Sequence, residues 1–160
     1  MKRQNHFLTD YTTLVAGMMI LASLLLFSCK KDNKDTTPQT VQFSGTLSGQ
    51  AEVPPVNSPG TGTVTATFDP ATKTLQYKFK WSNLSGPAKG MHFHDGAPGV
   101  SGGIVIPVSG FPNEPSGEVS GTSSPLNDTL ITDLMEGNLY GNIHTDDHKG
   151  GEVRAQMVKQ

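Results

Sequence analysis

The chain has 160 residues with 12 basic and 14 acidic side chains, giving a formal net charge of −2 at pH 7. Its lysines are scattered, so no basic stripe is available to neutralise phosphates, and binding to nucleic acid is excluded. A single cysteine excludes a disulfide within the chain.

The N-terminal 28 residues predict an export signal. Residues 14–27 (LVAGMMILASLLLF) follow two basic residues and form an apolar run that is too short for a transmembrane helix. Residues 26–29 (LFSC) resemble a bacterial lipobox, in which the cysteine is lipidated and becomes the first residue of the mature protein. Acylation explains a lone cysteine in an exported protein, although Cys29 could also stand in an ordinary cleaved signal. We therefore expect residues 1–28 to be removed and Cys29 to anchor the protein to a membrane of the bacterial cell envelope.

Residues 29–40 are charged and polar, and they predict a flexible tether between the membrane and a folded part. A short charged run after a lipobox cysteine resembles the signals that direct some Gram-negative lipoproteins to the outer membrane. We expect that location, on its periplasmic or its outer surface. Residues 41–158 then form one domain, large enough to bury a core without disulfides.

The dominant period of this domain is two, which is typical of half-buried strands. The alternating apolar positions are Val41, Phe43, Gly45 and Leu47; Val64, Ala66 and Phe68; Leu75, Tyr77, Phe79 and Trp81; and Val153, Ala155 and Met157. Residues 69–74, which contain Asp69 and Pro70, predict a turn that joins two of these strands in a hairpin. Eighteen glycines and eleven prolines with this pattern predict an all-β fold, an antiparallel β-sandwich or Greek-key barrel.

The same alternation predicts which side chains face the interior. They are Phe43, Leu47, Phe68, Tyr77, Phe79, Trp81, Phe93, Ile143 and Val153.

One segment, residues 126–135, has apolar residues at helical spacing. Asn127 or Asp128 could cap its start, and Gly137 could end it in a left-handed conformation. We expect one short helix across an end of the sandwich. The sequence contains no P-loop, dinucleotide fingerprint or Gly-x-Ser-x-Gly motif, so no enzyme class is indicated.

Three histidines form a candidate metal site. His92 and His94 lie two apart on a predicted strand and point to the same side, away from Met91 and Phe93. His144 occupies the outward position of a second predicted strand, so the three rings meet if these strands are neighbours. Imidazole nitrogens are typical ligands of zinc and copper.

Other side chains near the histidines are candidates for supporting roles. His148, Asp95 or Asp146 could supply a fourth ligand, and Glu152 could orient a ring. Alternatively, the histidines could form hydrogen bonds to loop carbonyls and have only a structural role. Glu152 and Arg154 could likewise pair with residues on neighbouring strands.

Six motifs, in order, resemble the CHRD domain, a family named for chordin and widespread in exported bacterial proteins. They are residues 47–56 (LSGQAEVPPV), 68–75 (FDPATKTL), 84–87 (LSGP), 92–99 (HFHDGAPG), 137–145 (GNLYGNIHT) and 150–156 (GGEVRAQ). The resemblance spans about residues 41–158.

What the resemblance implies is an all-β module without established enzymatic activity, which in chordin-like proteins is part of an extracellular scaffold. The family's characteristic polar positions are occupied here by His92, His94, His144, Glu152 and Arg154. Phe93 and Gly141 depart from the residues common in the family, and both fall on the predicted core face.

Two functions follow as hypotheses. The first is a non-catalytic envelope lipoprotein, held to the membrane through Cys29, that acts as a structural element or binds a protein or glycan partner. The second is a copper- or zinc-binding β-barrel, including a redox version similar to copper-zinc superoxide dismutase, whose copper face also uses a His-x-His strand. The redox version is disfavoured because one cysteine cannot form a stabilising disulfide and a second cluster of zinc ligands is missing from the sequence.

Overall fold

The computed structural model describes residues 39–160. The predicted signal peptide, Cys29 and nearly all of the predicted tether lie outside these residues. Within the described range the chain forms nine β-strands, one α-helix and one short 3-10 helix. Their bounds are β1 Val41–Ser48, η1 Gly49–Ala51, β2 Thr61–Asp69, β3 Thr74–Ser82, β4 Gly90–Asp95, β5 Gly103–Pro107, β6 Gly117–Thr122, α1 Asp128–Glu136, β7 Leu139–His144, β8 Val153–Gln156 and β9 Val158–Lys159.

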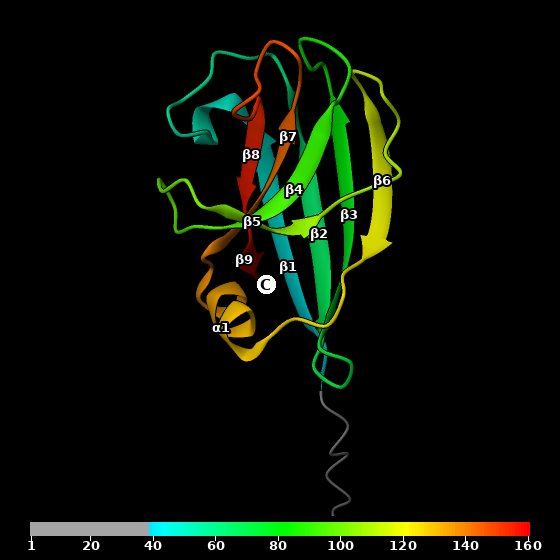
Figure 1. Ribbon diagram of the computed structural model, residues 1–160, viewed down its shortest axis with the longest axis vertical. Helices are drawn as coiled ribbons and strands as arrows, with labels where there is room; N and C mark the ends of the chain where they lie inside the picture. Colours follow the sequence, from blue (N-terminus) through cyan, green and yellow to red (C-terminus); the bar gives the residue numbers. More distant parts are fainter. Residues whose placement is uncertain (1–38) are drawn as a thin grey trace, which may run out of the picture. The chain divides into compact units, whose positions relative to one another are not determined.

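The strands form one antiparallel sheet in the order β5-β4-β7-β8-β1-β2-β3-β6, with the short β9 also paired to β1. The sheet curls, so that β4 and β5 lie in front of β2 and β3 in Figure 1. Side chains from β3 and β4 meet inside the curl, since the Phe79 and Phe93 rings are 5.1 Å apart. The prediction of an all-β barrel or sandwich with one short helix is confirmed.

The β2–β3 hairpin forms where the turn residues predict it. Its strands pair from Thr61 opposite Ser82 to Asp69 opposite Thr74. The Asp69 carboxylate accepts a hydrogen bond from the backbone N–H of Ala71 at 2.8 Å, which closes the turn.

The inner face of the curl holds the hydrophobic core. All nine residues predicted to face the interior are buried. Tyr77, Phe79 and Phe93 form an aromatic cluster with edge-to-face geometry. A Cβ at Gly141 would lie 2.8 Å from Cζ of Phe79, so this glycine makes room for the ring.

The helix α1 also follows its sequence signals. The Asn127 side chain accepts a hydrogen bond from the Leu130 N–H at 2.8 Å, and Gly137 ends the helix with φ of 77°. Leu134 is the residue of the helix that packs fully into the core, and α1 lies at one end of the sheet (Figure 1). In residues 39–160, no helix has the length and apolar character needed to span a membrane.

Candidate metal centre

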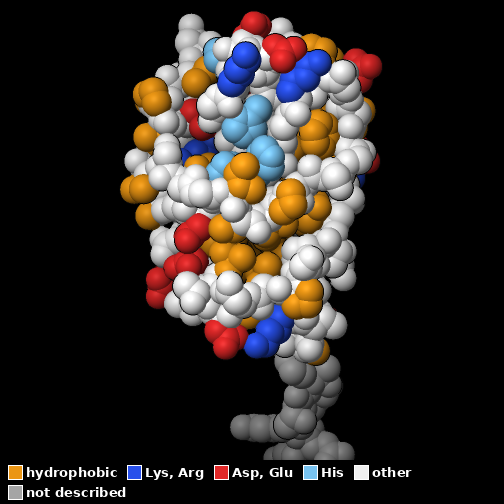
Figure 2. Space-filling model, in the orientation of Figure 1, with side chains coloured by type: hydrophobic (Ala, Val, Ile, Leu, Met, Phe, Trp, Pro, Cys, Tyr) orange, Lys and Arg blue, Asp and Glu red, His pale blue; other side chains and the backbone are white. Residues whose placement is uncertain are grey.

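The three candidate histidines come from two strands that are neighbours in the sheet. β4 pairs antiparallel with β7, with His92 opposite Asn142, Gly90 opposite His144 and His94 opposite Tyr140. This register brings the three rings to the face of the ladder opposite the core, and histidine side chains gather at the surface in Figure 2. The pairing that the candidate site requires is therefore present.

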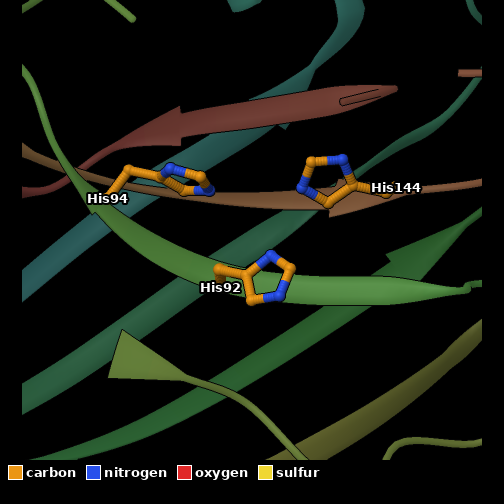
Figure 3. A group of neighbouring side chains, drawn as sticks. All are labelled: His92, His94 and His144. Carbon is orange, nitrogen blue, oxygen red and sulfur yellow. The ribbon is translucent and has the colours of Figure 1, made fainter. Parts of the chain in front are cut away.

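One nitrogen atom from each ring lies within 4.8 Å of the other two. Figure 3 shows that His94 and His144 each turn a nitrogen toward the other ring, while His92 turns a nitrogen toward the gap between them. The centroid of the His92 ring is 5.7 Å from that of His94 and 5.2 Å from that of His144. A spacing of this kind needs only small side-chain movements to bring three nitrogens to about 2.0–2.1 Å from one ion.

Backbone carbonyls fix the outer nitrogens of two rings. Nδ1 of His94 is 3.0 Å from the carbonyl oxygen of Gly102, and Nδ1 of His144 is 2.9 Å from that of Lys149. A carbonyl oxygen can only accept, so each Nδ1 carries the hydrogen. In the neutral rings each Nε2 is then left with a free lone pair, which is the arrangement found in metal-ligating histidines.

The third ring, that of His92, is placed differently from the other two. In the described part of the chain its Nδ1 is buried and has no hydrogen-bond partner. Burial lowers the pKa of His92 to about 4, with further lowering by His144 and His94. Burial also lowers the pKa of His144, although its bond to Lys149 opposes this. Both rings are thus neutral at pH 7, the form that binds metal.

The outward face is more enclosed than strand alternation predicts. His94 is only 8% exposed because the loop 96–102, which follows β4, folds over it. Tyr140 stacks on the His94 ring with centroids 4.9 Å apart. The rings are therefore held in place by contacts on several sides.

The proposed fourth ligands do not join the cluster. Among the described residues, the group of side chains placed to share an ion consists of the three histidines, without His148, Asp95 or Asp146. Asp146 instead lies 3.5 Å from Nζ of Lys89. Asp146 and His148 lie in the turn after β7, whereas Asp95 is the last residue of β4 and is paired with Leu139 of β7.

Among residues 39–160, Glu152 has neither a histidine nor a basic side chain as its partner. It is fully buried and accepts hydrogen bonds from the Ser58, Ser85 and Thr145 hydroxyls and from the Ser85 N–H, at 2.6–2.7 Å. Burial alone would raise the pKa of Glu152, but these hydrogen bonds outweigh it and hold the pKa below its ordinary value. Its role is to join three loops.

Arg154 also has a structural role, in the loop 96–102. Its guanidinium donates to the carbonyl oxygens of Ala97 and Val100, each at 3.0 Å. The guanidinium carbon lies 3.4 Å from the centroid of the Tyr140 ring, a cation–π contact. Arg154 and His94 therefore fasten the same loop, because His94 binds Gly102 at its other end.

Two residues that the sequence did not single out lie behind the histidines. Asn142 is 2% exposed and its Oδ1 is 3.0 Å from Nε2 of His94 and 3.1 Å from Nε2 of His144. Glu52 is 6% exposed, and burial raises its pKa to about 7 against the opposing effects of Arg154, Asn142 and the Val53 backbone. Asn142 stands two residues before His144 and therefore on the same face of the predicted strand, and this spacing is the sequence signal for its place beside the histidines.

The family comparison agrees with the six sequence motifs. The model of the CHRD domain family matches residues 43–157. No curated protein and no solved structure matches the chain.

Proposed function

The chain belongs to the CHRD domain family, and from this premise we propose that it is a non-catalytic envelope lipoprotein whose domain binds a zinc or copper ion through His92, His94 and His144. The observation that carries the proposal is the convergence of three ring nitrogens within 4.8 Å of one another. Carbonyl groups hold two of these rings with Nε2 turned inward. The third ring offers a buried nitrogen with no partner among the described residues.

A non-catalytic role fits both the family and the site. The CHRD family is not known for an enzymatic activity. Within residues 39–160, the three histidines are the one group of at least three His, Cys, Asp or Glu side chains placed to share an ion. A paired copper and zinc centre of the superoxide dismutase kind would require a second such group. We also propose that the module has a binding partner, either a protein or a glycan.

Replacing His92 by alanine tests the metal site with little structural disturbance. His92 Nδ1 has no hydrogen-bond partner in the described chain, so the change removes a ligand and leaves the carbonyl bonds of the other rings intact. We expect the affinity for Zn²⁺ to fall by more than the roughly 10–100-fold that loss of an outer-shell partner causes. Calorimetric titration of the purified, chelator-treated protein with ZnCl₂ and CuCl₂ measures this.

His148→Ala is the matched control, because His148 lies outside the cluster and should bind Zn²⁺ as tightly as wild type. Equal affinities for wild type and the His92→Ala variant, or no binding by wild type, would disprove the metal site and leave a purely structural role for the histidines.

The anchor is tested separately from the metal. We expect the mature protein to begin at a lipidated Cys29 and to lack residues 1–28. Mass spectrometry of the membrane fraction should show an N-terminal peptide carrying acyl chains. Cys29→Ala should release the protein from membranes while leaving its thermal unfolding midpoint unchanged, since the predicted core begins beyond it. An unmodified Cys29 in the membrane fraction would contradict the proposal.

A further inference from the structure

Asn142 occupies the position of a fourth ligand. It faces His92 across the β4–β7 ladder, and its Oδ1 lies 3.0 and 3.1 Å from the inner nitrogens of His94 and His144. At 2% exposure the amide is closed off from solvent, so these rings are its partners rather than water.

The atoms that meet at this point are all electron-pair donors. Each Nδ1 of His94 and His144 carries its hydrogen toward a carbonyl, so in the neutral rings each Nε2 presents a lone pair. The Oδ1 of an amide also has lone pairs and no hydrogen. The buried Nδ1 of His92 is without a partner in residues 39–160 and turns to the same gap (Figure 3). Such a set of donors is stabilised by a cation between them.

Turning the amide through 180° would replace Oδ1 by a hydrogen-bond donor, and Glu52 opposes that turn. Nδ2 of Asn142 and the Glu52 carboxyl lie beside each other next to Gly151, because a Cβ on that glycine would be 2.8 Å from Nδ2 and 2.8 Å from Cδ of Glu52. The Asn142 amide also lowers the pKa of Glu52, against the larger effect of burial. With Nδ2 toward Glu52, the amide N–H groups face a carboxylate. The reversed amide would place its oxygen against that carboxylate.

Gly151 leaves space for the side chains of Asn142 and Glu52 to lie next to each other. Its φ of +128° is one that side chains rarely adopt. A Cβ at this position would lie 2.8 Å from Nδ2 of Asn142 and would also collide with the Glu52 carboxyl. Asn142 and Glu52 thus approach each other over a backbone position that only glycine fits.

We infer that Asn142 Oδ1 is the fourth protein ligand of the ion and that Glu52 positions it by accepting from Nδ2. The inference rests on the proposed metal site. Three imidazole nitrogens and one amide oxygen complete the four-coordinate set that zinc adopts in structural sites. A complete set leaves no open position for substrate or anion, so the ion is held for structure or storage rather than for catalysis.

Cobalt(II) is the probe, because its visible absorption reports the number of ligands on the ion. The test uses the full-length protein in detergent, titrated with CoCl₂ and then with sodium azide. Wild type should give a four-coordinate spectrum that azide does not change. In Asn142→Leu, which keeps the shape and removes the oxygen, Co²⁺ affinity should fall about tenfold or more, and azide should alter the spectrum. Asn142→Asp should restore tight binding with a shifted spectrum.

Glu52 is tested with a second pair of variants. Glu52→Met, which removes the acceptor, should weaken Co²⁺ binding roughly 10–100-fold, and Glu52→Gln, which keeps an acceptor, should recover most of it. Circular dichroism verifies the fold of every variant, and Asn142→Asp decides the matter if Asn142→Leu does not fold.

Failure of the metal site and failure of the role of Asn142 give different experimental results. If wild type binds neither Zn²⁺ nor Co²⁺, the metal site itself is disproved. If wild type binds and Asn142→Leu matches it in affinity, spectrum and indifference to azide, the three histidines stand as the site and the role of Asn142 is overturned. An unchanged cobalt spectrum in Asn142→Asp overturns it equally.

Discussion

Replacing Phe79 by alanine should lower the free energy of unfolding by about 3–5 kcal/mol, a large part of the roughly 5–15 kcal/mol by which a typical domain is stable. The Phe79 ring is fully buried, lies 5.1 Å from Phe93 and 6.2 Å from Tyr77 between centroids, and fills the space left by Gly141. The rings of Phe93 and Tyr77 are rigid and Gly141 has no side chain, so these neighbours cannot fill the cavity that the loss of Phe79 would create. Urea denaturation followed by tryptophan fluorescence measures the change.

Ile104→Ala is the control for this prediction. Ile104 is a large apolar residue of β5 that is 56% exposed, and surface changes of this kind usually stay within about 0.5 kcal/mol. A Phe79→Ala variant that unfolds at nearly the same urea concentration as Ile104→Ala would show that β3 does not face the core as described.

Replacing Glu152 by glutamine should cost on the order of 2–4 kcal/mol, although the two side chains have the same shape. The carboxylate accepts four hydrogen bonds from groups on three loops. An amide offers one oxygen for these donors, and bonds to a charged acceptor are worth about 1.5–3 kcal/mol each. Thermal unfolding at pH 7 should show the loss, whereas Glu118→Gln, which removes only the exposed partner of Lys78, should have little effect.

Glu152 should also make the stability of the domain depend on pH in the acidic range. The folded-state pKa of Glu152 is held below its ordinary value of 4.5, so the unfolded chain takes up this proton first as pH falls. The stabilisation is complete above the unfolded pKa and is lost as pH falls through the folded pKa. Below pH 4.5 the unfolding midpoint of wild type should therefore fall more steeply than that of Glu152→Gln. Parallel curves would show that another carboxyl controls the acid transition.

Strand alternation predicted the core and the face of the candidate site. It placed Phe79 and Phe93 inside and His92, His94 and His144 on the other side, because a strand leaves each side chain only two directions. The helix was equally predictable, since Asn127 and Gly137 are strong local signals for its two ends. These features depend on interactions between residues close in sequence.

The enclosure of the site could not be predicted in this way. Glu152 and Arg154 occupy outward positions, yet both are buried because loops fold over that face of the sheet. Their partners, such as Ser58 and Ala97, are more than fifty residues away in the chain. Strand alternation predicts the direction in which a side chain leaves its strand. It does not predict whether a loop covers that side chain.

The place of β8 in the sheet has a consequence for how the protein reaches its folded state. β8 lies between β7 and β1, so the half of the sheet that carries the histidines joins the other half through the last residues of the chain. Contacts between the two ends of a sequence form slowly, because a long loop must close before they are gained. The sheet cannot be completed until β8 has been synthesised, so its two halves join only when nearly all of the described chain is present.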